Sequence, residues 1–202
     1  MQNCQYDLGN SIFNSINMLR DQRGTPGLKL DDRLQIQAQN WANEITRKDV
    51  WEHNPNKAHA DMVYKKTFYN FPIEIDGQDA FTWWAWGACD YRYYGREPPE
   101  NKRGRYDYLA QILWYNTTKV GFGCAYRYIN EFDTVLYVVA MYDPPGNVYC
   151  QYKYNVWPEK GSEIYKYLKE HPNRLEPKCI KRPLPNNTVP ITKPKITRKP
   201  RI

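Results

Sequence analysis

The stretch GRYDYLAQILWYNTTKVGFGCAYRY, residues 104–128, decides the fold of this protein. Its second half packs apolar and aromatic residues around a Gly-Phe-Gly-Cys sequence, which is typical of a strand. A second run of this type, TVLYVVAMYDPPG (134–146), follows after the turn-like sequence NEFD (130–133). The two runs predict an antiparallel pair of strands near 118–128 and 134–143.

Helices are predicted before these strands. Apolar residues recur at helical spacing in NSIFNSINMLRDQR (10–23) and in DDRLQIQAQNWANEITRKDV (31–50). Asp31 or Asp32 is the expected N-cap of the second helix. QDAFTWWAWGACDYRYY (78–94) is apolar on nearly every side, so we expect a third helix that is buried against several neighbours or against a ligand.

The remaining segments complete the expected architecture. Residues 51–77, rich in Asn, Pro and Lys, are interpreted as a loop, and residues 161–171 as a short helix. Helices on both sides of a small antiparallel sheet place the chain in the α+β class, as an α-β-α sandwich. We expect one folded domain over residues 1–160 and a basic, Pro-rich extension over 161–202.

The charge of the chain is concentrated at its C-terminal end. The protein has 202 residues and a net charge of +7, and residues 178–202 contain eight Lys or Arg and no acid. The rest of the chain is close to neutral, so no nucleic-acid face is expected, although the tail could contact a polyanion or a host protein. No apolar run reaches the roughly 20 residues that span a bilayer, so the chain is not expected to be transmembrane.

The cysteines and two glycosylation sequons indicate a secreted, extracellular protein. The five cysteines are widely spaced and form no CxxC pair: Cys4, Cys89, Cys124, Cys150 and Cys179. Two disulfides and one free thiol are the simplest count, and the spacing leaves the pairing open. Asn116 and Asn186 are sequon asparagines. The start, MQNC, reads as a mature N-terminus with an added methionine.

Three separated motifs, covering about residues 6–160, resemble the CAP superfamily of cysteine-rich secretory, antigen 5 and pathogenesis-related proteins. The first is the family's helix-one and helix-two pattern, carried here by Asn17, Arg20, Pro26, Leu28, Leu34, Ala38 and Gln39. The second, LAQILWYNTTKVGFGCAY, is similar to the family's G-H-Y-T-Q-V-V-W…V-G-C-G segment. The third, YVVAMYDPPGN, resembles its closing Y-x-P-P-G-N. Within the superfamily, the chain most resembles the venom-allergen-like proteins of parasitic worms.

The resemblance implies a central cleft where many family members place two histidines and two glutamates that can hold a divalent metal. His53 matches the first histidine, and Asp61, or Met62 in a shifted register, stands for the first glutamate. The second glutamate position falls on Gly87, or on Trp86 in the other register. The last histidine position falls on Tyr108.

This degenerate set of four positions, His53, Asp61, Gly87 and Tyr108, lacks the ligands of a tight metal site. We therefore expect no cofactor and no enzyme activity. His59 is a possible substitute ligand, although a solvated loop histidine is the simpler interpretation. Tyr108 is expected to be a packed aromatic residue with its hydroxyl in the old cleft.

The resemblance instead implies binding of hydrophobic lipids. In this superfamily a fatty acid has been placed between helices one and three. The matching faces here are formed by Ile12, Phe13, Ile16, Leu19, Phe81, Trp84, Ala85 and Ala88. A sterol is the second candidate ligand, at aromatic residues of the predicted loop: Trp51, Tyr64, Phe68, Tyr69 and Phe71.

Each lipid site has a plainer interpretation, because the helices could pack without a void and the aromatic rings could simply cap the core. Two other functions also remain open from the sequence. One is an immunomodulatory ligand that acts through its surface and basic tail. The other is a metal-dependent hydrolase, which the lost ligands disfavour.

Overall fold

The computed structural model describes residues 2–3, 6–69 and 77–171. Its helices are α1 (Tyr6–Gln22), α2 (Asp32–Lys48), α3 (Gly77–Trp84), the 3₁₀ helix η1 (Trp86–Cys89), α4 (Glu100–Leu113), α5 (Tyr152–Asn155) and α6 (Glu163–Glu170). Its strands are β1 (Gln2–Asn3), β2 (Lys29–Leu30), β3 (Ala60–Tyr69), β4 (Lys119–Tyr128) and β5 (Asp133–Asp143). Two long strands, β4 and β5, lie where the sequence predicts them.

The sheet is built around the β4–β5 hairpin. The strand order is β1-β4-β5-β3, with antiparallel pairing at each step, and the short β2 pairs with β4 in parallel. Gly123 of β4 lies opposite Val139 of β5, and Val63 of β3 lies on the other side of Val139. The helices α3 and α4 pack over one face of the sheet and enclose a site with the start of β3.

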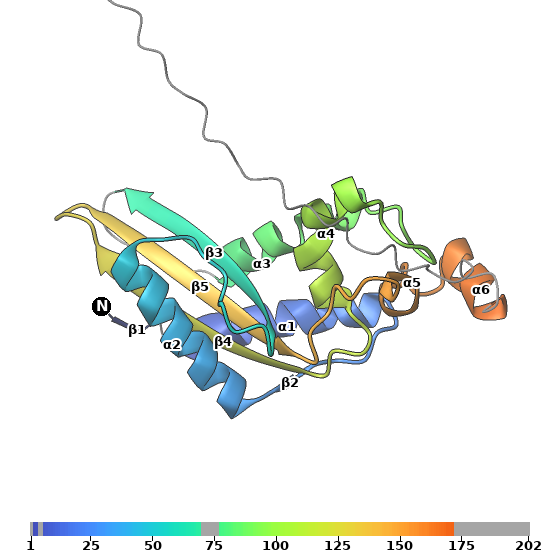
Figure 1. Cartoon of the computed structure of the whole chain (residues 1–202), viewed down its shortest axis with the longest axis horizontal. Coiled ribbons are helices and arrows are strands. Elements are labelled where there is room, and N and C mark those ends of the chain that lie inside the picture. The colour runs from blue at the N-terminus through green and yellow to red at the C-terminus, as the bar shows by residue number, and fades with distance from the viewer. Residues whose placement is uncertain (1, 4–5, 70–76, 172–202) are drawn as a thin grey trace, which may run out of the picture.

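The two faces of the sheet carry separate layers of helices, as Figure 1 shows with α2 on one side and α1, α3 and α4 on the other. Successive residues of a strand point to opposite faces, so every second residue of β5 belongs to the same layer. Val139 packs with α2, whereas Val138 packs with α1, α3 and α4. This arrangement confirms the predicted α-β-α sandwich with a small antiparallel sheet.

The motif residues of the first two helices hold the layers together. Asn17 of α1 accepts from the Leu28 backbone N–H at 2.7 Å and donates to the Leu28 carbonyl at 3.2 Å. Gln39 of α2 makes the same two-way contact with the backbone of Cys124 in β4, at 2.8 and 3.2 Å. An amide side chain has both a donor and an acceptor, so each one satisfies the backbone N–H and the carbonyl of a single residue.

The Gly-Phe-Gly sequence of β4 lets α2 approach the sheet closely. A Cβ atom at Gly121 would lie 2.2 Å from the Gln35 backbone nitrogen, and one at Gly123 would lie 2.2 Å from that of Gln39. Both contacts are shorter than any real Cβ contact, so the helix backbone occupies the space that a side chain would need. The two glycines therefore set the distance between α2 and the sheet.

Three predicted elements are wrong. Residues 51–77 were expected to be a loop, but Ala60–Tyr69 form β3, which pairs along its whole length with β5. The stretch 78–94 was expected to be one helix, but α3 ends at Trp84 and is followed by η1. The helix α4 was not expected at all, because its apolar residues are crowded into its second half. Asp31 is the N-cap of α2, as one of the two expectations had it.

The cysteines and sequons divide between described and undescribed parts of the chain. Cys124 and Cys150 each take part in a disulfide bond, and Cys89 is a free thiol. Asn116 is exposed. Cys4, Cys179, Phe71 and Asn186 lie outside the described residues, so two disulfides and both glycosylation sites stay predictions.

The short helix near 161–171 is confirmed as α6, which contacts the body of the domain. The Lys160 N–H donates to the Gln22 carbonyl at 2.7 Å, and Leu168 is buried. The domain boundary at residue 160 stays a prediction. Within the described residues, every helix falls short of the length and apolar character needed to cross a membrane.

Candidate functional site

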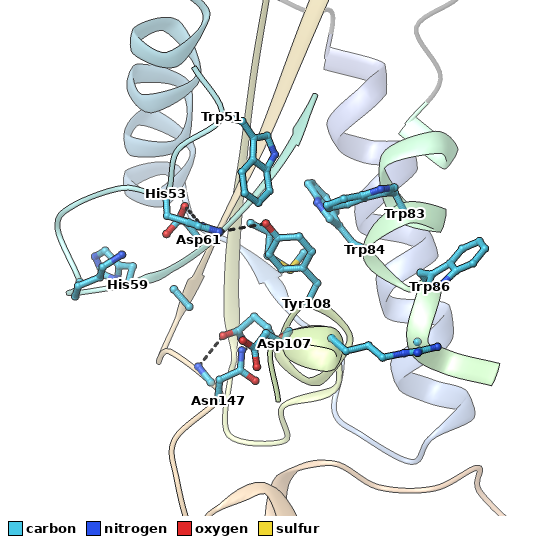
Figure 2. Close-up of a pocket in the computed structure, with 18 residues that line it drawn as sticks. Trp51, His53, His59, Asp61, Trp83, Trp84, Trp86, Asp107, Tyr108 and Asn147 are labelled. Atoms are coloured by element: carbon cyan, nitrogen blue, oxygen red, sulfur yellow. Dashed lines mark hydrogen bonds and ion pairs between the residues drawn. The ribbon is translucent and has the colours of Figure 1, made fainter. Parts of the chain in front are cut away.

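A cleft of about 750 Å³ opens between the β3 edge of the sheet, α3, η1 and α4. Figure 2 shows the indole and phenol rings that line it. All four positions of the degenerate set border this cleft, although they are far apart in the sequence: His53, Asp61, Gly87 and Tyr108. A cleft of this size lies within the range of small-ligand sites, about 300–1,000 Å³.

His53, Asp61 and Tyr108 form one hydrogen-bonded chain. Asp61 enters the cleft from β3, and its carboxylate lies 2.9 Å from His53 Nδ1 and accepts from the Asn54 backbone N–H at 3.1 Å. The Tyr108 hydroxyl, from α4, lies 3.3 Å from His53 Nε2. Only 5% of the Asp61 side chain is exposed, against 38% for His53. The carboxylate is therefore held inside, and the imidazole reaches the cleft.

Four aromatic rings contact one another in a closed cycle at the cleft: Trp51, His53, Trp83 and Tyr108. Trp51 contacts His53 at 5.4 Å between ring centroids and Trp83 at 6.5 Å. Trp83 contacts Tyr108 at 5.4 Å, and Tyr108 contacts His53 at 6.0 Å, which closes the cycle. Edge-on and tilted contacts of this kind are the favoured geometries of aromatic pairs. The cycle gives the cleft stiff, apolar walls with one polar corner.

The Tyr108 hydroxyl is a neutral donor in this environment. Burial raises the pKa of Tyr108 to about 12, and the nearby carboxylates of Asp61 and Asp107 act in the same direction, whereas a hydrogen bond from the Val63 backbone opposes them. Burial also raises the pKa of Asp107, and a hydrogen bond from the Tyr152 hydroxyl opposes that shift. A phenol with a raised pKa is a poor nucleophile but a dependable hydrogen-bond donor.

The residues at the family's metal positions do not fit a metal. A Cβ at Gly87 would lie 2.7 Å from the Tyr106 ring, so the ring fills the place where a carboxylate would enter. His59 lies 3.3 Å from Asp143, away from the chain that His53 forms. Among residues 2–3, 6–69 and 77–171, no three His, Cys, Asp or Glu side chains are grouped closely enough to hold an ion.

We predict that zinc does not bind stoichiometrically in the cleft, because two ligand positions hold Gly87 and Tyr108. Isothermal titration calorimetry with zinc should show no one-to-one binding at micromolar affinity. The variant His59→Ala controls for adventitious binding at the surface. One-to-one binding that His53→Ala abolishes and His59→Ala preserves would contradict this prediction and reopen the hydrolase alternative.

The cleft also contains residues that sequence reasoning missed. Asp107 and Asn147 line its lower part, where the Asn147 amide donates to the Asp107 carbonyl at 2.9 Å. Asn147 ends the Pro-Pro-Gly-Asn motif, and the Gly146 N–H donates to Gln111 of α4 at 2.7 Å. The Pro-Pro-Gly-Asn motif itself was visible in the sequence. Its contact with α4 was not, because that contact depends on the tertiary structure.

The predicted lipid-binding residues differ in how deeply they are buried. Ile12, Ile16, Leu19 and Trp84 are buried in the core beneath the sheet. Others are partly buried against that core: Phe13, Phe81, Ala85 and Ala88. A Cβ at Gly77, the first residue of α3, would lie 2.7 Å from the Leu8 carbonyl of α1. The two helices are therefore in tight contact at that end.

The predicted sterol residues separate in a similar way. Trp51 borders the cleft, and Tyr64 contacts Trp83 of its aromatic cycle at 6.1 Å. Phe68 packs on the core, and Tyr69 is 73% exposed at the far end of β3. The strand geometry explains the split, because residues along β3 rise by about 3.3 Å each and so leave the cleft behind.

Comparison with known proteins gives one consistent result. A family model described as CAP, cysteine-rich secretory protein family, matches residues 13–142. The human Golgi-associated plant pathogenesis-related protein 1 is 26% identical over 153 residues, which cover 75% of this chain and 93% of that protein. Secreted protein RBT4 of Candida albicans is 28% identical over 140 residues, which cover 68% of this chain and 35% of that protein. The chain thus spans about a third of the Candida protein.

Solved structures agree on the fold. The structure of BmVAL-1 matches with a TM-score of 0.52 at 19% identity, covering 72% of this chain and 80% of that one. The venom allergen-like protein 4 of Schistosoma mansoni matches with a TM-score of 0.50 at 15% identity, covering 80% of this chain and 99% of that one. At these identities the likeness concerns the fold alone.

Proposed function

The chain belongs to the CAP family of cysteine-rich secretory proteins, and from this premise we propose that it is an extracellular, non-catalytic protein that binds hydrophobic lipids. A sterol in the aromatic cleft is the ligand that the geometry supports best. The observation that carries this proposal is the cycle of Trp51, His53, Trp83 and Tyr108 around a cleft of about 750 Å³.

The physical basis is the burial of apolar surface against rigid rings. Trp83 is 46% exposed and Trp51 is 47% exposed, so much of their surface faces water. Covering such surface yields about 25 cal/mol per Å². Rings that are already fixed by edge contacts lose little freedom on binding, which lowers the cost of ordering the site. A flat, rigid ring system matches these walls.

The charges beside Tyr108 favour a neutral ligand over a fatty acid, although the cations Lys57 and Arg105 also line the cleft. The carboxylates of Asp61 and Asp107 lie close enough to Tyr108 to raise its pKa. A fatty-acid carboxylate in this corner would meet like charges, which is unfavourable at low dielectric. A neutral hydroxyl avoids that cost.

A fatty acid between α1 and α3 is the second lipid candidate, supported by the half-buried rings of Phe13 and Phe81. The close contact at Gly77 disfavours a ligand at that end of α3, so the fatty acid is proposed to bind at the other end, near Ala85 and Ala88. Substitution by tryptophan at either alanine would fill that part. These variants therefore separate the two lipid sites.

Two features of the cleft disfavour catalysis. Tyr108 stays protonated, and the family's metal positions lack their ligands. CAP proteins are in general not enzymes. The absence of enzyme activity is accordingly part of this proposal.

Filling the cleft at Gly104 should weaken sterol binding. A Cβ at Gly104 would meet nothing within 4 Å, so Gly104→Phe places a ring at the cleft without a clash in α4. Because four tryptophans line the cleft, bound fluorescent sterol should quench protein emission by energy transfer. We expect Gly104→Phe to weaken binding by about tenfold or more, the effect of losing ~1.4 kcal/mol.

Two variants are the controls for this experiment. Lys102→Phe adds the same ring to an exposed position of α4 outside the cleft, and Ala88→Trp fills the helix groove instead. Both should bind sterol as the parent does. Unchanged binding in Gly104→Phe, with loss in Ala88→Trp, would move the site to the helix groove.

If the parent binds neither sterol nor fatty acid, the interaction-protein alternative replaces lipid binding. That function would act through the surface and through residues 178–202, which lie outside the described residues. Deleting that segment removes eight positive charges and no acid, so binding to a polyanion such as heparin should weaken.

A further inference from the structure

We propose that Tyr108 and His53 together recognise a ligand hydroxyl, so that the cleft selects alcohols over ketones, ethers and carboxylates of the same skeleton. This inference rests on the proposed function, because it names the polar group of the lipid that the cleft binds. It assigns a role to the hydrogen-bonded chain of Asp61, His53 and Tyr108, which the apolar walls alone leave unexplained.

Asp61 fixes which groups donate and which accept in this chain of hydrogen bonds. A carboxylate only accepts hydrogen bonds, so His53 Nδ1, at 2.9 Å from it, carries a proton. The backbone N–H of Asn54 donates to the same oxygen and holds it in place. In the neutral imidazole the other nitrogen, Nε2, is then an acceptor, and it faces the cleft beside the Tyr108 hydroxyl.

The Tyr108 end is a donor. Its hydroxyl keeps its proton because burial and two carboxylates disfavour the phenolate. The contact to His53 Nε2, at 3.3 Å, lies beyond the usual 2.5–3.0 Å range of O–H···O hydrogen bonds and slightly beyond the 2.7–3.2 Å range typical where nitrogen takes part. A long contact is weak, so exchanging it for two shorter bonds to a ligand costs little.

A hydroxyl is the ligand group that satisfies both partners. Its proton can be donated to His53 Nε2 while its oxygen accepts from Tyr108. A ketone or an ether offers only an acceptor, which leaves His53 Nε2 without a donor in a partly buried site. A carboxylate adds a negative charge near Asp61 and Asp107. A site with fixed polar groups discriminates strongly against a ligand that leaves one of them unpaired.

The test uses three ligands that share one skeleton: a 3-hydroxysterol, its 3-ketone and its 3-methyl ether. Dissociation constants are measured for the parent and for Tyr108→Phe, which keeps the ring and removes the donor. Tyr115→Phe, at an exposed position outside the cleft, is the matched control. We expect the parent and the control to prefer the hydroxysterol by about tenfold or more, and Tyr108→Phe to reduce that preference to about twofold or less.

The outcomes distinguish this inference from the proposed function. If the parent binds all three ligands equally and Gly104→Phe weakens all binding, the cleft is a lipid site and hydroxyl recognition is overturned. If the hydroxyl preference persists in Tyr108→Phe, the role given to Tyr108 is overturned. If no sterol binds the parent, the proposed function fails and this inference fails with it.

Discussion

Replacing Arg20 with alanine should lower the free energy of unfolding by about 3–5 kcal/mol, which is a large share of the 5–15 kcal/mol typical of a domain. Arg20 is fully buried in α1 and donates to carbonyl oxygens of four residues: Pro26, Ile112, Trp114 and Thr117. These bonds measure 2.7–3.0 Å. They join α1 to the end of α4 and to the segment that enters β4.

The cost arises on the acceptor side. Each buried carbonyl that loses its donor costs about 1–3 kcal/mol, and the space left by the guanidinium is a cavity. Arg20 has no exposed surface, so water cannot readily replace its hydrogen bonds, and the same burial lowers the pKa of Arg20 to about 10. Arg20→Lys should not restore the stability. A single ammonium group cannot reach the four acceptors that lie around the planar guanidinium of arginine.

Chemical denaturation of Arg20→Ala and Arg23→Ala provides the measurement. Arg23 lies in the same region, is half-buried, and donates a side-chain hydrogen bond to the Tyr94 hydroxyl at 2.8 Å. Its loss should cost about 1 kcal/mol. Equal effects of the two substitutions would show that the buried network does not stabilise the fold as argued.

Replacing Gly123 with alanine should also have a large effect. The added methyl group should lower the free energy of unfolding by about 3 kcal/mol, the upper end of the cost of overpacking. The new Cβ would lie 2.2–2.4 Å from backbone atoms of Ala38 and Gln39 in α2. A helix backbone cannot rotate aside as a side chain can, so α2 must move off the sheet. That shift also breaks the paired hydrogen bonds between Gln39 and Cys124.

The matched substitution is Gly104→Ala, in which the added methyl group meets nothing within 4 Å. Alanine is preferred to glycine within a helix by about 0.5–1 kcal/mol, so this variant should be slightly more stable than the parent. Thermal unfolding of both variants compares the two sites directly. A Gly123→Ala variant as stable as the parent would mean that the contact between α2 and β4 is looser than the structure has it.

The sequence predicted best where residues near in the chain decide the structure. The strands near 118–128 and 134–143 and the two first helices follow from local periodicity, and these elements are enough to specify the sandwich. The residues Asn17, Arg20 and Gln39 mark the family because each completes a contact that the sandwich requires. Local patterns carried this information since strands and amphipathic helices each bury one regular face.

Prediction was wrong where a segment's partners lie far away in the sequence. Ala60–Tyr69 looks like a loop because its polar and aromatic residues follow no simple alternation, yet the exposed edge of β5 pairs with all of it. The helix α4 has a weak apolar pattern because one side of it lines a cleft rather than the core. In both segments tertiary contacts outweigh local propensity.

Motifs that are local in the sequence were enough to identify the family and the sandwich, because they record residue types at fixed spacings. The prediction that two metal ligands are missing rests on the residues at positions 87 and 108. The surroundings of residues 87 and 108, in contrast, are visible only in the tertiary structure. It places the Tyr106 ring where a residue-87 side chain would go and brings Tyr108 within 3.3 Å of His53. A cleft is a relation between surfaces of separate elements, and its shape depends on how β3, α3 and α4 pack, which no local pattern encodes.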